Sequence, residues 1–255
     1  MKQPDKYAVV GNPIAHSKSP EIHRLFAQQT RQSISYERLE APLDGFEEFA
    51  LGLREAGYQG LNVTIPFKLD AAKLADRLTP RARLAGAVNT LKFDGDAITG
   101  DNTDGIGFVR DVTQRLKFRI QDSSILVLGA GGGVRGLIGS LLEEKPKWIA
   151  VANRTHDRAQ ELADEFGVLA LSFDEVPAEH FDLVINGTAT SLSHTTPPID
   201  AETFDDCMLA YDLLYAPAPT PFMQLASRGG ARKVSDGLGM LIEQAAESFH
   251  LWRGV

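Results

Sequence analysis

A lysine stands at an unusual place in this sequence, directly before a segment with helical periodicity. Lys68 follows Pro66-Phe67 and precedes the helix that we expect over Leu69 to Arg77. A proline near the first helical position is a common start signal, so the ammonium would lie at the positive end of the helix dipole. A positive potential favours the neutral amine, and a lysine with a lowered pKa can act as an acid or base near neutral pH. The alternative is a solvated surface lysine that tolerates its position.

Polar residues gather in the run Gly100-Asp101-Asn102-Thr103-Asp104-Gly105. Thr103 or Asp104 could cap the helix that follows, but four polar residues are more than one cap requires. A carboxylate such as Asp104 near Lys68 would raise the pKa of the lysine and partly offset the dipole effect, and the pair could titrate jointly. Upstream, Asn89-Thr90 puts an amide where an apolar residue would be ordinary.

Hydroxyl and amide side chains recur before the expected helices of the first hundred residues. Ser17 and Ser19 precede Pro20, and Ser19 is a good N-cap for a helix with a first-turn proline. Two hydroxyls beside a helix start can also bind a carboxylate. Asn62 and Thr64 alternate along a predicted strand and therefore face the same side.

A glycine-rich turn follows the predicted strand Ser124–Leu128 and reads Gly129-Ala130-Gly131-Gly132-Gly133-Val134-Arg135-Gly136. In a strand–glycine–helix context, Gly129 permits the tight turn and Gly131 lets the backbone approach a pyrophosphate at the helix N-terminus. The third glycine of the usual spacing falls on Val134, although a register starting at Gly131 also fits. The alternative is a flexible loop without a ligand.

The end of the next predicted strand indicates which dinucleotide would bind. An NAD site places an acidic residue there for the ribose hydroxyls, whereas this chain has Asn153-Arg154-Thr155, with Arg158 one helical turn on. The planar guanidinium of Arg154 suits a 2′-phosphate, so the sequence favours NADP over NAD. Arg158 has an alternative as a solvated helix residue.

Apolar strand-like runs alternate with amphipathic helix-like runs along the whole chain, which predicts an α/β fold with mostly parallel sheets. The expected strands are Tyr7–Val10, Ser33–Leu39, Leu61–Thr64, Val88–Phe93, Ser124–Leu128, Trp148–Ala152, Asp182–Ile185 and Met208–Leu213. The expected helices are Pro20–Gln29, Phe46–Ala56, Leu69–Arg77, Gly105–Leu116, Val134–Glu144, Arg158–Phe166, Pro221–Ser227 and Leu238–Trp252. Asp94-Gly95-Asp96 is typical of a hairpin turn.

The composition is that of a globular protein without an obvious polyanionic partner. The 255 residues carry a formal net charge of −8 and no basic run, which argues against nucleic acid or an anionic membrane as a main partner. Cys207 is the single cysteine, so no intrachain disulfide forms and a reducing cytoplasm fits. The first apolar run stops at Gly11 and is too short for a signal or membrane-spanning segment.

Taken in order, several motifs resemble those of the shikimate dehydrogenase family across nearly the whole chain. They are Gly11-Asn12-Pro13 with Ser17-Lys18-Ser19-Pro20, Asn62-Val63-Thr64 with Pro66-Phe67-Lys68, Gly86-Ala87-Val88-Asn89-Thr90, Gly100-Asp101-Asn102-Thr103-Asp104-Gly105, Asn153-Arg154-Thr155, and Asp236-Gly237-Leu238-Gly239-Met240 continuing to Ala246. Several separate matches in the right order are far more specific than the glycine turn alone.

The resemblance implies a two-domain enzyme that interconverts shikimate and 3-dehydroshikimate with NADP in the shikimate pathway of aromatic amino-acid biosynthesis. We therefore expect a substrate domain over 1–103, a Rossmann-type NADP domain over 104–236, and a C-terminal helix over 237–255 that returns to the first domain. The two domains would share a cleft. A cytoplasmic monomer or homodimer without a metal is expected.

The resemblance also implies roles for individual residues. Lys68 and Asp104 would form the catalytic pair. The substrate would be held by Ser17, Ser19, Asn62, Thr64, Lys68, Asn89, Asp104, Tyr215 and Gln244. The cofactor would be held by Gly129, Ala130, Gly131, Gly132, Gly133, Asn153, Arg154, Thr155, Arg158, Thr188, Leu213 and Gly237. Three of these residues have a purely structural alternative. Gln244 could be an exposed mid-helix residue, Tyr215 could pack at a strand end, and Gly237 could be only a helix-entry glycine.

The sequence departs from the family pattern in one cofactor loop, and two other functions stay open. The family usually has Asn-Ala-Thr-Ser-x-Gly, whereas this chain reads Asn186-Gly187-Thr188-Ala189-Thr190-Ser191 and lacks the later glycine. The chain ends at Val255, where the family often continues into a further helix. The alternatives are a quinate/shikimate dehydrogenase of broader specificity and a non-catalytic shikimate sensor.

Overall fold

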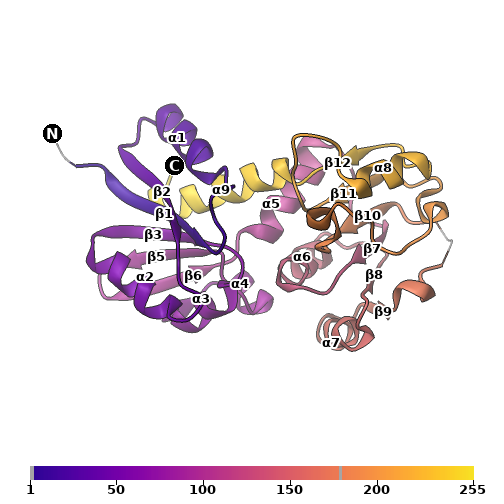
Figure 1. The fold of residues 1–255 in the computed structure, drawn as a ribbon, viewed down its shortest axis with the longest axis horizontal. Helices are drawn as coiled ribbons and strands as arrows, with labels where there is room; N and C mark the ends of the chain where they lie inside the picture. Colours follow the sequence, from indigo (N-terminus) through magenta and orange to yellow (C-terminus); the bar gives the residue numbers. More distant parts are fainter. Residues whose placement is uncertain (1–2, 178–179) are drawn as a thin grey trace. The chain divides into compact units, whose positions relative to one another are not determined.

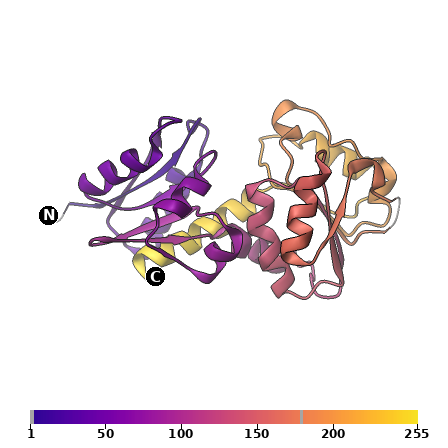
Figure 2. The same cartoon turned by 90° about the horizontal axis from the view of Figure 1, so that it is seen from below.

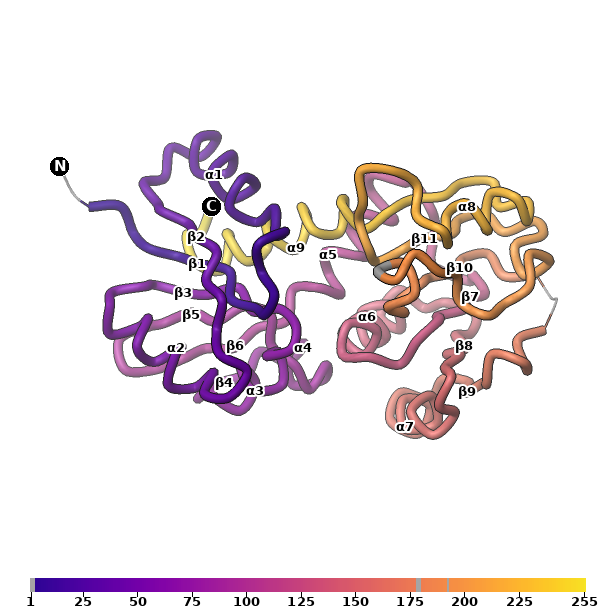
Figure 3. The backbone as a smooth tube through the Cα atoms, viewed as in Figure 1, coloured from indigo at the N-terminus to yellow at the C-terminus, as the bar shows by residue number. Residues whose placement is uncertain are grey.

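The computed structural model describes residues 3–177 and 180–255 and divides the chain into two compact units (Figures 1 and 2). Unit 1 comprises residues 1–107 and 241–255, and unit 2 comprises residues 108–240. The chain passes from unit 1 to unit 2 within α5 (Asp104–Arg110) and back within α9 (Leu238–Arg253), as the colours of Figure 3 allow the reader to follow. Both crossings lie a few residues after the expected boundaries at 103/104 and 236/237.

Unit 1 is built on a mixed, mostly parallel sheet of six strands in the order β2-β1-β3-β5-β6-β4. β1 pairs in parallel with β2 and β3, while β5 pairs antiparallel with β3 and β6. The predicted hairpin turn joins β5 to β6, with Asp94 opposite Ala97. The strands are β1 (Asp5–Gly11), β2 (Ile34–Glu40), β3 (Tyr58–Val63), β4 (Arg77–Leu78), β5 (Thr90–Asp94) and β6 (Ala97–Asp101).

Helices cover both faces of this sheet because its strands alternate apolar side chains to either side. On one face, Leu61, Val63 and Leu91 pack with residues of α2 (Phe46–Glu55), α3 (Lys68–Leu74) and α4 (Pro80–Ala85). On the other face, Tyr7 of β1 stacks on Trp252 of α9, with ring centroids 4.6 Å apart, and α1 (Ser19–Thr30) lies beside β1 and β2. The sheet is therefore buried on both sides, and residues at its strand ends are the ones free to meet a ligand.

Unit 2 is built on a fully parallel sheet in the order β12-β11-β10-β7-β8-β9. Numbered from its first strand, this order is that of a doubly wound dinucleotide-binding fold, which confirms the predicted fold class. The strands are β7 (Ser124–Leu128), β8 (Trp148–Ala152), β9 (Leu169–Leu171), β10 (Leu183–Asn186), β11 (Leu209–Asp212) and β12 (Val234–Ser235). The helices are α6 (Gly132–Glu143), α7 (His156–Phe166) and α8 (Pro221–Arg228), with a π-helical turn over Asp111–Arg115 and 3₁₀ turns over Phe173–Glu175, Thr190–Ser193 and Ala201–Phe204.

Alternate residues of β7 separate the two cores of unit 2. Ile125 and Val127 pack with apolar residues of α6 and α7 on one face of the sheet. Leu126 and Leu128 pack with Phe204 and Phe222 on the other face. The strand order reverses between β7 and β10, and ligands of such sheets bind outside the carboxyl ends of the strands at that reversal. The predicted glycine turn follows β7 and therefore lies at this place.

Some predicted elements differ from the observed ones. The helix expected to Arg77 ends at Leu74, because Arg77 and Leu78 pair with β6 as the two-residue strand β4. The strand expected from Val88 begins at Thr90. The short elements β4, α4, β9 and β12, and the strand β6, were not predicted. No helix in the described part of the chain is long and apolar enough to cross a membrane.

Candidate active site

Lys68 and Asp104 form a close ion pair in unit 1. α3 begins at Lys68, one residue before the expected start at Leu69, and the Lys68 carbonyl accepts a hydrogen bond from the backbone N–H of Val88. The Lys68 Nζ donates to Asp104 Oδ2 over 2.5 Å, and the two side chains are 19% and 9% exposed. An ion pair that is mostly removed from water keeps its charges close and its geometry defined, which suits proton transfer to a ligand beside it.

Asn89 holds the second oxygen of the Asp104 carboxylate. Its Nδ2 donates to Asp104 Oδ1 over 2.9 Å and to Thr103 Oγ1 over 2.9 Å, while its Oδ1 accepts from the Thr103 backbone N–H. The amide therefore determines which way the carboxylate faces. This contact explains why an amide occupies a position in the buried segment before β5, where an apolar residue would be ordinary.

Helix α9 contributes a second polar wall to the same site. Gln244 is buried, and its Oε1 accepts from Asn89 Nδ2 over 3.2 Å and from Thr103 Oγ1 over 3.3 Å. One turn further, Ser248 Oγ accepts from Asn62 Nδ2 over 3.0 Å and lies 2.7 Å from Thr90 Oγ1. The interpretation of Gln244 as an exposed helix residue is therefore wrong.

Ser17 and Ser19 are both buried and lie together, with 3.1 Å between their hydroxyl oxygens. The prediction that Ser19 is the N-cap of α1 is wrong, because the helix begins at Ser19 and its N-cap is Lys18, which makes no side-chain cap bond. The Ser17 hydroxyl instead accepts from the Ser19 backbone N–H over 3.3 Å. Arg38 Nε donates to the Ser17 carbonyl over 2.6 Å and so anchors this turn.

Asn62 lies near the end of β3, and Thr64 follows that strand directly. Asn62 is buried, and its Oδ1 accepts from the Tyr36 hydroxyl over 2.7 Å. Thr64 is half-buried, and its backbone N–H donates to the Val10 carbonyl over 2.9 Å. Its methyl group approaches Gly11, where a Cβ would lie 2.5 Å away, so glycine is required there.

The glycine turn of unit 2 has the geometry that its sequence predicts at two positions. Gly129 has φ +100°, and a Cβ there would lie 3.0 Å from the Gly187 carbonyl oxygen. Gly131 is the N-cap of α6, and a Cβ on Gly131, Gly132 or Gly133 would meet nothing within 4 Å. These glycines are exposed at the N-terminus of α6, a place that suits a pyrophosphate. α6 begins at Gly132, so these glycines start the helix.

The end of β8 presents the predicted basic group. Asn153 follows the strand, and its Nδ2 donates to the Thr155 carbonyl over 2.8 Å, which bends the chain into α7. Arg154, Thr155 and Arg158 are exposed at the start of that helix. No acidic residue occupies the position after β8, so the groups present fit a 2′-phosphate better than a pair of ribose hydroxyls.

The loop after β10 is fixed despite its departure from the family pattern. Asn186 Oδ1 accepts from the Thr188 hydroxyl over 2.6 Å, and Ser191, which takes the place of the family's later glycine, donates to Asp212 Oδ2 over 2.7 Å. Beside it, Gly237 lies so close to Leu213 that a Cβ would be 2.2 Å from the Leu213 carbonyl oxygen. Packing against Leu213 therefore requires glycine at position 237, directly before α9. Tyr215 follows on the same half-buried segment.

Four polar residues of the unit 1 site were not predicted as members: Tyr36, Thr90, Thr103 and Ser248. The sequence indicates Thr103 as a helix cap, and Ser248 lies one turn after Gln244, a spacing that places both on one helix face. Tyr36 carries no signal in the sequence, because its contact with Asn62 joins strands that are not neighbours in the sheet.

Comparison with known proteins places these features in one family. Models of the shikimate dehydrogenase substrate binding domain, of shikimate/quinate 5-dehydrogenase and of the shikimate 5′-dehydrogenase C-terminal domain match residues 9–91, 111–212 and 237–255. The shikimate dehydrogenase (NADP(+)) of Herminiimonas arsenicoxydans is 54% identical over 254 residues, covering 98% of this chain and 93% of that protein. That of Nitrosospira multiformis is 50% identical over 255 residues, with 98% and 93% covered.

Solved structures with a similar fold include a shikimate dehydrogenase. The shikimate 5-dehydrogenase of Thermus thermophilus in complex with NADP(H) and shikimate has a TM-score of 0.90 and 35% identity, covering 98% of this chain and 94% of that one. The Ael1 enzyme of Pseudomonas putida has a TM-score of 0.92 and 44% identity, with 98% and 94% covered.

Proposed function

The chain belongs to the shikimate dehydrogenase family, and we propose that it catalyses the reversible, NADP-dependent reduction of 3-dehydroshikimate to shikimate in aromatic amino-acid biosynthesis. The observation that carries the proposal is the Lys68–Asp104 pair, 2.5 Å apart and held by Asn89. A ketone reduction requires a proton at the forming alkoxide, and this pair can deliver one.

In the proposed mechanism, the chemistry that NADPH supplies when bound is hydride transfer to the ketone carbon. Lys68 donates a hydrogen bond to the substrate oxygen and gives it a proton as negative charge develops. Asp104 holds the ammonium in place, and Asn89 keeps the carboxylate facing it. In the reverse direction the same pair removes the hydroxyl proton. General acid–base help of this kind contributes about 10²–10⁴-fold to a rate.

The other polar groups of unit 1 are proposed to bind the substrate. Ser17 and Ser19 bind the carboxylate, because they supply two buried hydroxyls at the start of α1. The ring hydroxyls are bound by Asn62, Thr64, Asn89, Asp104 and Gln244. Tyr215 is also proposed to contact the substrate.

The cofactor residues are all proposed in unit 2. The turn from Gly129 to Gly133, including Ala130, takes the pyrophosphate at the N-terminus of α6, and Arg154 binds the 2′-phosphate with help from Arg158. Asn153 and Thr155 border the adenosine, Thr188 lies near the cofactor, and Leu213 with Gly237 borders the nicotinamide. The exposed position of Arg154 and the open space at Gly131 support this assignment.

Steady-state rates with the purified full chain test the proposal. Shikimate and quinate are each offered with NADP and with NAD, and reduced cofactor is followed by absorbance. We expect turnover of shikimate with NADP at the highest kcat/KM. Equal rates with quinate would favour the broader dehydrogenase, and shikimate binding without turnover would favour a sensor. Size-exclusion chromatography tests the proposed monomer or homodimer, and cell fractionation tests the proposed cytoplasmic location.

A further inference from the structure

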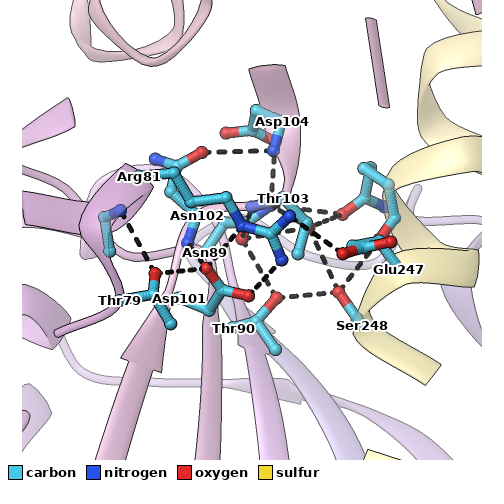
Figure 4. A network of polar contacts seen from close by, with 12 residues as sticks. Thr79, Arg81, Asn89, Thr90, Asp101, Asn102, Thr103, Asp104, Glu247 and Ser248 are labelled. Atoms are coloured by element: carbon cyan, nitrogen blue, oxygen red, sulfur yellow. Dashed lines mark hydrogen bonds and ion pairs between the residues drawn. The ribbon is translucent and has the colours of Figure 1, made fainter. Parts of the chain in front are cut away.

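Arg81 is a charged residue in unit 1 that the proposed chemistry leaves unused. It is the second residue of α4, whose N-cap Thr79 accepts from the Ala82 backbone N–H. Figure 4 shows its guanidinium between two carboxylates. Nε donates to Asp101 Oδ1 over 2.7 Å and Nη2 to Asp101 Oδ2, while Nη1 donates to Glu247 Oε1 over 2.8 Å. A planar guanidinium that makes such contacts fixes distance and orientation together.

One arm of this bridge leads to the Asp104 backbone. Asp101 is buried at the end of β6, and its Oδ1 also accepts from Thr79 Oγ1 over 2.5 Å and from the Asn102 backbone N–H over 2.8 Å. Asn102 Oδ1 in turn accepts from the Asp104 backbone N–H over 3.1 Å. Hydrogen bonds therefore connect the turn that carries Asp104 to the Asp101 carboxylate, which is also the carboxylate that binds Arg81.

The other arm leads to helix α9. Glu247 lies three residues after Gln244, and residues at this spacing lie on the same side of a helix. Gln244 meets Asn89 and Thr103 through its Oε1. Asn89 also holds Asp104. Arg81 thus ties the helix that supplies Gln244 to the turn that supplies Asp104, two segments far apart in the sequence.

We infer that Arg81 is a positioning residue, which sets Gln244 and Asp104 at the spacing that the substrate requires by bridging Glu247 to Asp101. The inference rests on the proposed function, since it assigns Gln244 to the substrate and Asp104 to the catalytic pair. Its effect should be on shikimate and not on NADP, because all of these residues lie in unit 1.

The first test is Glu247→Ala, which removes the α9 arm and keeps the Arg81–Asp101 pair. We expect the KM for shikimate to rise about tenfold, as for the loss of a hydrogen bond to a charged group. The KM for NADP and the thermal midpoint should stay near those of the parent. Glu243→Ala, one turn earlier on α9, makes the same charge change and should leave the KM for shikimate unchanged.

A double-mutant cycle separates positioning from general loosening. In a Gln244→Ala background, Glu247→Ala should add nothing to the KM for shikimate, because the group that it positions is gone. The same rise in both backgrounds, or no rise in either, would overturn the inference.

Arg81→Lys tests the fork geometry while keeping a cation beside the buried Asp101. We expect kcat/KM for shikimate to fall about tenfold or more, since small misplacements are costly in catalysis. Arg83→Lys, on the exposed side of α4, is the matched control. An Arg81→Lys enzyme with parental kcat/KM would contradict the inference.

Lys68→Ala, measured alongside, distinguishes the two failures. If Lys68→Ala is inactive while the Glu247 and Arg81 variants are normal, the inference alone is wrong. If Lys68→Ala turns over shikimate normally, the proposed acid–base role of Lys68 is wrong. If the parent enzyme itself does not turn over shikimate with NADP, the proposed function is wrong and the inference is wrong with it.

Discussion

The imidazole of His23 lies in α1 with no exposed surface, and neither ring nitrogen has a hydrogen-bond partner among the described residues. It stacks on Tyr36 with ring centroids 4.2 Å apart, and Trp252 lies 5.5 Å away. Burial lowers the pKa of His23 from 6.5 to about 3, and the nearby Asn62 offsets only part of that shift. The folded protein therefore holds this ring neutral over a range in which the unfolded chain protonates it.

A pH-dependent loss of stability follows for unit 1. Between about pH 6.5 and 3 the unfolded chain binds a proton that the folded chain does not, so the free energy of unfolding falls as pH falls, by at most about 1.4 kcal/mol per pH unit from this residue. His23→Phe should remove that part of the slope. Urea unfolding, followed by Trp252 emission in a Trp148→Phe background, measures it between pH 7 and 4.5. His250→Gln, at an exposed histidine of α9, should keep the parental slope. Equal slopes in His23→Phe and its parent would refute the prediction.

At the scale of elements, the glycines between β7 and α6 differ in whether the backbone conformation requires them. Gly129 is required by the fold, since its φ is +100° and Gly187 lies against it. Gly131 has an ordinary backbone conformation, φ −85° and ψ 174°, with open space where a Cβ would point. The fold therefore does not require glycine at position 131, and under the proposed function this open space holds the pyrophosphate.

Substituting these two glycines separates folding from cofactor binding. Gly131→Ala should leave the thermal midpoint near that of the parent and raise the KM for NADP about tenfold or more, because the methyl group would occupy the space of the pyrophosphate. Gly129→Ala should lower the thermal midpoint, since a side chain is strained at that φ. Thermal melts and steady-state kinetics give both quantities, with Gly52→Ala in α2, also in open space, as a control for KM. An unchanged KM for NADP in Gly131→Ala would argue against a cofactor at this turn.

For the whole molecule, the features that could be predicted are those that short contiguous stretches of sequence determine. The turn at Gly129, a helix that starts within one residue of Leu69 and the hairpin at Gly95 each depend on neighbours along the chain, and the structure has all three. The site-forming contacts of Gln244 with Asn89, 155 positions apart, carry no local signal. Motif resemblance pointed to both residues but not to their contact.

The missed elements have the same cause. β4 has two residues and exists because Arg77 and Leu78 pair with β6, and β12 likewise depends on β11. The place of Ser19 before Pro20 predicts an N-cap, but its hydroxyl lies against Ser17 instead. In each case tertiary contacts overrode a local preference that is worth only about 1 kcal/mol.

The account as a whole depends on Lys68 acting as the acid–base group. Turnover of shikimate with NADP by Lys68→Ala is the direct test, with Lys73→Ala, at an exposed lysine of the same helix, as the control. We predict that kcat falls about 10²–10⁴-fold in Lys68→Ala, because the proton donor is lost, while the dissociation constant for NADP and the activity of Lys73→Ala stay near those of the parent. A Lys68→Ala enzyme with near-parental kcat would contradict the account.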